Sequence, residues 1–310
     1  MKWTCSWILL LALAAAQAGD RAADADRPFT VGTYNLEGYI DVVSPGRTLK
    51  TAAAKAKIRE SLRRMNADIL AVQEIGRPSA LEELRTSLKA DGLDYPHAEH
   101  VAGWDTNIFV GVLSRFPIVA RRPHTNDHFL LEGRRFQVSR GFAEVDVRVA
   151  PNYTLTVITA HLKSRRTIAD ADQAAMRAQE AILLRQKIDA VLERNARANL
   201  VVLGDFNDTK DTPPIRTLIG RGRNALVDTR PAERNGDTEP NPIPRFEPRH
   251  ITWTHYYGKE DSYSRVDYIL VSPGLAREWD PAGTHIVTVA NWGVASDHRP
   301  ITARFHAADR

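Results

Sequence analysis

The fold is decided by the stretch Leu200-Val201-Val202-Leu203-Gly204-Asp205-Phe206-Asn207. Its first four residues are apolar and include β-branched side chains, which predicts a short buried strand. A carboxylate and an amide follow the strand directly. Polar side chains at the ends of buried strands lie at the edge of a sheet, where several of them can converge on one cleft. A chain that repeats this pattern is therefore expected to build one polar site from several strand ends.

The same pattern recurs five more times along the chain. In each case a strand-like run ends in, or carries, a carboxylate, an amide or an imidazole. Asn35 and Glu37 are two residues apart, so they share a face while their strand persists. Carboxylates, amides and histidines without cysteine ligands suit a hard divalent cation and a phosphate ester, which points to metal-assisted phosphoester hydrolysis. The five segments are Thr33–Gly38, Ile69–Glu74, Thr159–Ser164, Arg265–Leu270 and Ser296–His298.

The composition is that of an ordinary soluble globular protein. With 310 residues, 43% of them hydrophobic and 26% charged, the chain can form one large domain or two small ones. No internal repeat or linker divides it, so we expect one catalytic domain over residues 29–307. The formal charge of +4 and the pI of about 9.2 weakly favour an anionic partner such as nucleic acid or an acidic membrane surface.

The first 18 residues have the features of a secretory signal peptide. Lys2 supplies the positive start, and the apolar run Trp7–Ala16 is too short to span a bilayer. Ala16-Gln17-Ala18 then fits the small-x-small cleavage rule. We expect a secreted or periplasmic protein in which residues 19–28 form a flexible leader. The single cysteine, Cys5, lies inside the signal peptide, so the mature chain would contain no disulfide. No other stretch is long and apolar enough for a transmembrane helix.

Strand-like and helix-like segments are mixed along the chain, and several neighbouring strands lack a helix between them. This arrangement favours an α+β fold with extended sheets over a regular doubly wound sheet. Helices are expected over 47–65 and 170–194, and a short one is expected to begin at Thr212-Pro213-Pro214. In the second helix the apolar positions Ala174, Ala178, Ile182, Ile188, Val191 and Leu192 follow a helical period. Strands are expected over 29–34, 68–72, 107–113, 141–149, 153–160, 200–203, 266–271 and 301–305.

Taken in order, the six motifs resemble the endonuclease/exonuclease/phosphatase superfamily, and the chain looks like an exported, bacterial-type member. The superfamily includes DNase I-like nucleases, abasic-site endonucleases, sphingomyelinases and inositol-phosphate 5-phosphatases. The resemblance covers residues 29–305, nearly the whole expected mature chain. It implies a four-layer α/β/β/α sandwich, in which two mixed β-sheets pack face to face with helices outside. The active site would lie at one end of the sandwich.

The resemblance also implies a metal site for Mg²⁺, or alternatively Mn²⁺. Glu74 matches the principal ligand, and Asn35 matches the amide beside it, which holds metal or phosphate. Asp297 matches a second acid near the metal. Glu37 stands where abasic-site endonucleases carry an aspartate, and its side chain is longer. Magnesium prefers few carboxylates and several waters, which agrees with this sparse set of ligands.

The catalytic roles carry over in the same way. Asp205 matches the residue that orients or deprotonates the attacking water, and Asn207 matches its partner on the phosphate oxygens. His298 matches the histidine that faces the phosphate, and Asp267 matches the carboxylate that orients it. His161 matches the histidine of the DNase-like and sphingomyelinase-like branches. Abasic-site endonucleases have a tyrosine at that position, so His161 argues against that branch.

Three functions remain open from the sequence. The first is a phosphodiesterase that cleaves DNA or RNA. The second is the same chemistry on a phospholipid such as sphingomyelin, or on a soluble phosphate ester; the sequence lacks a clear apolar, aromatic hairpin for membrane insertion. The third is a non-catalytic scaffold, which the complete catalytic set argues against. A monomer is expected. Candidate substrate contacts are the basic side chains Lys163, Arg165, Arg166, Arg134, Arg135 and Arg140 and the rings of Trp104, Trp253 and Trp292.

Overall fold

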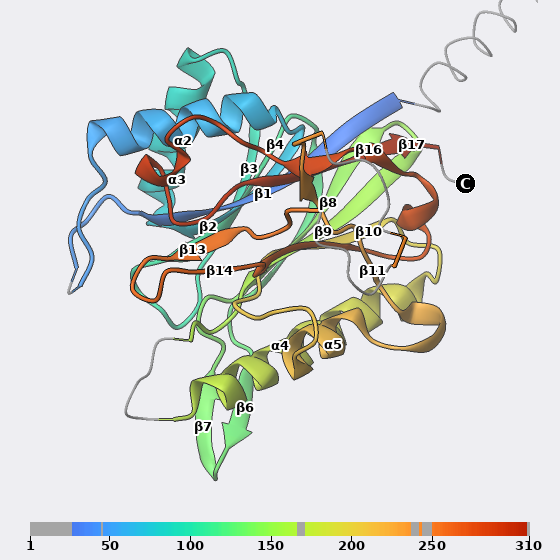
Figure 1. Ribbon diagram of the computed structural model, residues 1–310. Coiled ribbons are helices and arrows are strands. Elements are labelled where there is room, and N and C mark those ends of the chain that lie inside the picture. The colour runs from blue at the N-terminus through green and yellow to red at the C-terminus, as the bar shows by residue number, and fades with distance from the viewer. Residues whose placement is uncertain (1–26, 45, 166–170, 237–241, 244–249, 309–310) are drawn as a thin grey trace, which may run out of the picture.

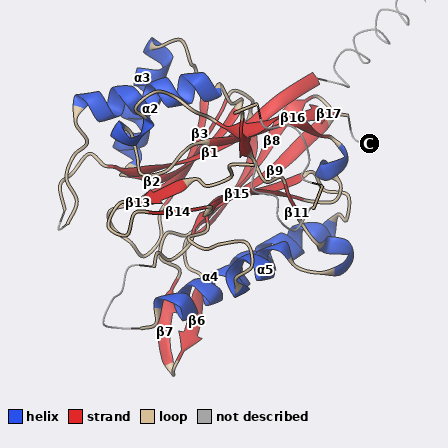
Figure 2. Cartoon of the chain, in the orientation of Figure 1, coloured by secondary structure: helices blue, strands red, loops and turns tan. Residues whose placement is uncertain are grey.

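Two β-sheets packed face to face form the centre of the molecule, and helices cover their outer faces (Figures 1 and 2). The computed structural model describes residues 27–44, 46–165, 171–236, 242–243 and 250–308. The four-layer sandwich expected from the sequence is therefore confirmed. The expected signal peptide (1–18) and nearly all of the leader (19–28) lie outside the described residues, so export stays a prediction. Among the described helices, none is both long and apolar enough to cross a membrane.

The first sheet contains seven strands. They are β1 (Arg27–Tyr39), β2 (Ile69–Ile75), β3 (His97–Val101), β4 (Phe109–Ser114), β12 (Ala232–Glu233), β16 (Trp279–Ile286) and β17 (Ile301–Ala307). Their order in space is β12-β16-β17-β1-β2-β4-β3. Helices α2 (Ala52–Met65) and α3 (Pro78–Ala90) lie over the outer face of this sheet (Figure 2).

The second sheet contains six strands. They are β5 (Ile118–His124), β8 (Phe142–Ala150), β9 (Tyr153–His161), β10 (Leu200–Asp205), β11 (Val227–Asp228) and β15 (Asp267–Val271), in the order β11-β15-β10-β9-β8-β5. Helices α4 (Gln173–Arg194) and α5 (Pro213–Ile219) cover its outer face (Figure 1). Short 3₁₀ turns occur at η1 (Gly222–Asn224), η3 (Leu275–Arg277) and η4 (Trp292–Val294).

The apolar run that opens β10 shows how the layers are held together. Val201 and Leu203 enter the core between the two sheets, whereas Leu200 and Val202 enter the core between the second sheet and its helices. Successive side chains of a strand point to opposite faces, so a strand buried on both sides must be apolar throughout. A third core lies between the first sheet and helices α2 and α3.

Each sheet contains a parallel pair of long strands joined through an α-helix, and the first sheet also pairs the two-residue β12 in parallel with β16. In the first sheet β1 runs parallel to β2, with α2 between them in the chain. In the second sheet β9 runs parallel to β10, with α4 between them. The carboxyl ends of parallel strands meet at one edge of a sheet. Because β1 contacts β10 and β2 contacts β9 across the sandwich, the two edges come together.

The helices begin where side chains cap them. Thr51 accepts a hydrogen bond from Ala54 N at 3.1 Å, so α2 begins at Ala52 and not at the expected residue 47. Asp172 accepts one from Ala175 N at 2.6 Å and fixes the start of α4. Helix α3 was not expected from the sequence, although it begins with a proline in its first turn and buries leucines at helical spacing.

The expected apolar face of α4 is partly wrong. Ala174 and Ile182 are exposed, while the polar residues Arg177 and Glu180 are buried. Glu180 accepts hydrogen bonds from Ser139 N, Ser139 Oγ and the backbone N of residue 163, all between 2.6 and 2.9 Å. The helix is thus oriented by polar contacts to loops, which hydrophobic periodicity does not report.

Two hairpins stand outside the sheets. Strands β6 (His128–Leu131) and β7 (Arg134–Gln137) form one that projects past α4 (Figure 1), and Leu130 on it is 70% exposed. Strands β13 (His255–Tyr257) and β14 (Ser262–Ser264) form the other. The sequence shows no clear apolar, aromatic hairpin for membrane insertion, and the β6–β7 hairpin exposes one large apolar side chain, Leu130.

A buried amide links the two sheets just beneath the converging strand ends. Gln73 Oε1 accepts a hydrogen bond from Thr33 Oγ1 at 3.0 Å, within the first sheet. Gln73 Nε2 donates to Thr159 Oγ1 at 3.1 Å, in the second sheet. All three residues are fully buried. A buried polar group that loses its partner costs about 1–3 kcal/mol.

We expect Gln73→Leu to lower the free energy of unfolding by roughly 1–3 kcal/mol, because it leaves both threonine hydroxyls unsatisfied. Urea denaturation measures this loss. The triple variant with Thr33→Val and Thr159→Val is the control. It removes the two unsatisfied hydroxyls and should recover most of the lost free energy of unfolding. Equal stability of Gln73→Leu and the unmodified chain would show that the bridge contributes nothing.

Candidate active site

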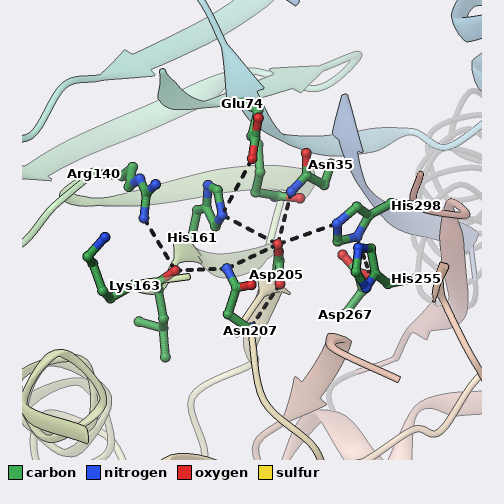
Figure 3. Close-up of polar contacts among 12 residues, drawn as sticks. Asn35, Glu74, Arg140, His161, Lys163, Asp205, Asn207, His255, Asp267 and His298 are labelled. Atoms are coloured by element: carbon green, nitrogen blue, oxygen red, sulfur yellow. Dashed lines mark hydrogen bonds and ion pairs between the residues drawn. The ribbon is translucent and has the colours of Figure 1, made fainter. Parts of the chain in front are cut away.

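The ends of the two parallel pairs bring four side chains together (Figure 3). Asn35 comes from β1, Glu74 from β2, His161 from β9 and Asp205 from β10. Asn35 Nδ2 donates to Asp205 Oδ2 at 2.9 Å, and His161 Nε2 lies 3.4 Å from the same oxygen. Residues that are 170 positions apart in the chain are thus in contact, as the strand-end pattern predicts.

Local backbone geometry aims these side chains into the site. Gly204 has a φ of +136°, and a Cβ there would lie 2.1 Å from the carbonyl oxygen of Ala160. Only glycine permits this approach, which sets Asp205 beside His161 in the β9–β10 register. Glu74 lies at a register shift in both of its strand pairings and has a φ of +56°. Such bulges and left-handed residues are concentrated at functional sites.

Asp205 is the centre of the hydrogen-bond network. Its Oδ1 accepts from Asn207 N at 2.8 Å, and its Oδ2 accepts from Asn35 and, at 3.3 Å, from Asn207 Nδ2. Burial and the nearby charge of Asp267 raise the pKa of Asp205 to about 6, although His298 and the hydrogen bonds oppose this. The carboxylate is therefore more basic than an exposed aspartate and is held in one orientation.

His298 and Asp267 form a buried pair next to Asp205. His298 Nδ1 donates to Asp267 Oδ2 at 2.9 Å, and His298 Nε2 lies 3.7 Å from Asp205 Oδ2. Burial lowers the pKa of His298, but the charges of Asp267 and Asp205 outweigh it and hold this pKa well above its usual value. The imidazole therefore carries a positive charge at neutral pH. Ser296 fixes its backbone, because Ser296 Oγ accepts from His298 N and donates to Asn35 O.

His161 has the opposite electrostatic character. Its side chain is buried, and burial together with the positive charge of Arg140 holds its pKa well below the usual value. The ring is therefore neutral at physiological pH. Its Nε2 lies between Asp205 Oδ2 at 3.4 Å and Glu74 Oε1 at 3.9 Å. His161 and His298 thus differ in charge, because His298 has a carboxylate near each of its ring nitrogens, whereas both carboxylates near His161 lie on the side of its Nε2.

Three acids line the outer side of the site. Arg47 Nη1 lies 3.0 Å from Glu74 Oε2, and Lys50 Nζ lies 3.3 Å from Glu37 Oε2. Burial, with added repulsion from Asp297 and Glu74, raises the pKa of Glu37 although Lys50 opposes this. Such repulsion among carboxylates would be relieved by a bound cation. The donor set therefore fits a divalent metal ion.

Two groups of side chains have ligand atoms within 4.8 Å of one another. One consists of Asp205, Asp267 and His298, and the other of His255, Asp297 and His298. The buried Asp/His cluster is consistent with a metal site, although its His298–Asp267 pair is already hydrogen-bonded. In the part of the chain that the structure describes, Glu37 and Glu74 join neither group. The predicted metal set is thus close by but is not assembled into one cluster of three.

His255 was not expected from the sequence. Its ring centroid lies 4.6 Å from that of His298, and its Nε2 lies 3.5 Å from Asp297 Oδ2. Together with the charge of His298, this contact holds the pKa of Asp297 below its usual value against the effect of burial. His255 reaches the site through backbone pairing of β13 with the Asp297-His298 segment. No local motif reports such a pairing.

The basic side chains near the site are largely tied to the protein. Arg165 donates to the carbonyl oxygen of Asn207 at 3.2 Å and to Asp208 Oδ1 at 3.0 Å, and Arg177 donates to Asp208 Oδ2 at 2.8 Å. Arg140 is buried and donates to Leu162 O at 3.5 Å. These contacts brace the loop that follows β10. Arg166, the other predicted contact in this cluster, lies outside the described residues.

Comparison with solved structures shows the same fold in several proteins. The chain is similar to truncated TDP2 from Caenorhabditis elegans, with 16% identity, a TM-score of 0.59 and coverage of 90% of this chain and 98% of that one. It is also similar to sphingomyelinase C from Streptomyces griseocarneus, with 18% identity, a TM-score of 0.59 and coverage of 90% of this chain and 99% of that one. The human nocturnin catalytic domain has 16% identity and a TM-score of 0.61, with coverage of 90% of this chain and 95% of that one. At these identities the likeness concerns the fold.

The sequence itself also carries the family pattern. No curated protein sequence matches the chain. The family described as "Endonuclease/Exonuclease/phosphatase family" matches it over residues 32–298, which includes every site residue described above. The chain therefore belongs to the endonuclease/exonuclease/phosphatase family of phosphoester hydrolases.

Proposed function

We propose that the protein is a metal-dependent phosphodiesterase that cleaves DNA or RNA with a water molecule activated by Asp205. One observation carries the proposal. A buried carboxylate, oriented by Asn35 and Asn207, lies 3.7 Å from the cationic imidazole of His298. A base for water and a positive charge for the phosphate thus stand side by side, which is what hydrolysis of an anionic ester requires.

In this mechanism Asp205 accepts a proton as the water oxygen attacks phosphorus. The two asparagines hold the carboxylate, so its lone pair faces the water without reorganisation. His298 faces the phosphate oxygens and stabilises the added negative charge. Asp267 keeps the Nδ1 of His298 protonated. His161, which is neutral, can donate a hydrogen bond to the phosphate without adding charge. The bond from phosphorus to the leaving oxygen then breaks, and the leaving oxygen takes a proton from solvent water, which gives an alcohol and a phosphomonoester.

The same proposal assigns the metal to the outer acids. Glu74, Glu37 and Asp297, with Asn35 beside them, would hold Mg²⁺ or Mn²⁺. When bound, the ion supplies positive charge to the phosphate oxygens. Burial raises the pKa of Glu37 and repulsion from Asp297 and Glu74 adds to this, so the crowding of these carboxylates supports the assignment. Arg47 and Lys50, which now neutralise two of these carboxylates, would share them with the ion.

A second candidate substrate is a phospholipid. The observation that favours it is the β6–β7 hairpin, which exposes Leu130 beside Arg135, its cross-strand neighbour. An apolar side chain flanked by positive charge suits the surface of an anionic membrane. Catalysis would use the same residues, so the two candidates differ only in what the surrounding loops bind.

A substrate panel separates the candidates. With Mg²⁺ present, the purified protein without residues 1–18 is expected to cleave plasmid DNA, single-stranded DNA or RNA faster than sphingomyelin or a generic diester. Cleavage of nucleic acid should weaken as salt rises, because phosphate contacts release counterions. Rapid hydrolysis of sphingomyelin without cleavage of nucleic acid would select the second candidate. A chain inactive on the whole panel would contradict both.

We also propose that the protein is exported and that the mature chain begins near Gly19. The support is Lys2, the apolar run after it and the Ala16-Gln17-Ala18 cleavage sequence. Amino-terminal sequencing of the protein from its native host should give a start close to residue 19 outside the cytoplasm. An intact cytoplasmic chain that begins with Met1 would refute export.

A further inference from the structure

A hollow of about 610 Å³ lies next to the candidate active site. The carboxylates of Glu37 and Asp297 belong to its lining. Asp297 Oδ1 lies 3.8 Å from His298 Nε2. The hollow therefore starts one side chain away from the imidazole that faces the scissile phosphate in the proposed reaction. A substrate group directly attached to that phosphate would enter it.

Three aromatic side chains, together with Asn291 and Gly293, make up the rest of the lining. Tyr256, Tyr263 and Trp292 all border the hollow. The ring of Tyr263 lies 4.8 Å from that of Tyr256 at 33° and 4.8 Å from that of Trp253 at 59°, and Trp253 contacts Trp292 at 5.6 Å. Arg299 packs over the other side of the cluster, 4.1 Å from the ring centre of Trp253. These contacts hold the rings in place, although Tyr263 remains 56% exposed.

Backbone hydrogen bonds join the segment that carries Tyr256 to the segment Asp297–Arg299, which contains His298. Tyr256 N donates to Asp297 O at 2.9 Å, and Arg299 N donates to Thr254 O at 2.6 Å. The two hydrogen bonds flank His298 on both sides. The position of the Thr254–Tyr256 backbone relative to His298 is therefore fixed by the fold. Exposed aromatic rings that are held rigidly next to a reaction centre are suited to binding a flat group of the substrate.

We propose that this hollow binds a nucleobase adjoining the scissile phosphate and stacks it on Tyr263 and Trp292, so that the enzyme acts on single-stranded nucleic acid. The inference rests on the proposed nuclease function. Every base has a π-face, so stacking accepts any sequence. A base in a duplex is already stacked on its neighbours and is not available to the hollow, whereas a base in a single strand is.

A quaternary ammonium headgroup is the competing occupant, because rings and carboxylates both attract it. The ring geometry favours the base. Tyr256 and Tyr263 lie against each other with ring centroids 4.8 Å apart, so no ligand group fits between them and only their outward surfaces border the hollow. Recognition of an ammonium group instead relies on rings that surround it on several sides. The headgroup is retained as one outcome of the test.

Binding is measured first, through the fluorescence of the tryptophans in the cluster. Adenosine 5′-monophosphate is expected to bind about 5- to 100-fold more tightly than ribose 5-phosphate, which lacks the base. Tyr263→Ala should abolish this difference, and Tyr263→Phe should retain it because the ring remains. Tyr257→Ala is the matched control, since Tyr257 is exposed on the same hairpin but does not line the hollow. Phosphocholine should bind no better than ribose 5-phosphate.

Cleavage is measured next, on a single-stranded oligonucleotide that carries one base-free tetrahydrofuran residue. The unmodified protein should cut at the phosphates beside this residue about 5- to 100-fold more slowly than elsewhere. Gly293→Leu should weaken the preference by filling the hollow, because a Cβ at Gly293 meets no atom within 4 Å and the backbone there does not require glycine.

The outcomes separate failure of the nucleobase subsite from failure of the nuclease function. Cleavage of the oligonucleotide at equal rates with and without the base would overturn the subsite and leave the nuclease function standing. Absence of any oligonucleotide cleavage would overturn the nuclease function and the subsite with it. Binding of phosphocholine that depends on Tyr263, without binding of the nucleotide, would assign the hollow to a lipid headgroup and overturn the nucleobase.

Discussion

Asp205→Asn is expected to lower kcat by about 10²–10⁴-fold, the usual cost of removing a general base or one transition-state contact. The amide keeps the shape of the side chain, and its oxygen can still accept the hydrogen bond from Asn35. It cannot take a proton from water. Steady-state kinetics on the best substrate of the panel measure the effect.

The control for this variant is Asp211→Asn. Asp211 is exposed, lies six residues further along the chain and takes no part in the site. Its replacement should leave kcat unchanged. Thermal denaturation of both variants should show little loss of stability, because neither change removes apolar contacts from the core. A kcat near the unmodified value in Asp205→Asn would mean that another group activates the water.

Removal of divalent cations is expected to abolish hydrolysis, and added Mg²⁺ or Mn²⁺ should restore it. The reason is the group of mutually repelling carboxylates at Glu37, Glu74 and Asp297, which a cation would neutralise. Glu74→Gln should lower activity by about 10²-fold or more, because the metal ion loses a carboxylate ligand and the site loses one unit of negative charge. Calorimetric titration with Mn²⁺ should show weaker binding, which separates loss of metal from loss of chemistry.

Glu82→Gln is the matched control, since Glu82 is exposed on α3 and pairs with Arg85 on the same helix. It should leave both activity and metal affinity as they were. Full hydrolysis in excess EDTA, after the protein has been stripped of metal, would contradict a metal-dependent mechanism.

The strand ends of this protein could be read from its sequence because their signals are local. A buried strand needs a continuous apolar run, and a polar group at its end then stands out, as Asp205 and Glu74 do. All eight expected strands have counterparts in the structure, with ends shifted by a few residues. The edge strands β3 and β5 were missed because their faces are mixed and half-buried.

What the sequence did not reveal depends on contacts between distant segments. His255 enters the site only because β13 pairs with the segment around His298. Glu180 is buried on α4 because backbone groups of two separate loops donate to it. The cluster of Trp253, Tyr263 and Trp292 is assembled from a loop, a hairpin and a short turn. In each case the decisive partner is far away in the chain, so no periodicity or motif announces it.

The pairing of the first described strand with the last has a consequence for synthesis. β17 lies between β16 and β1, and residues 27–33 of β1 pair with residues 301–307 of β17. The first sheet therefore cannot close until residues 301–307 have left the ribosome, and such long-range strand pairing is intrinsically slow. A nascent chain whose first sheet stays unpaired until β17 has been made can still pass, unfolded, through a narrow secretion pore. The export proposed above would then require no machinery to unfold a finished protein.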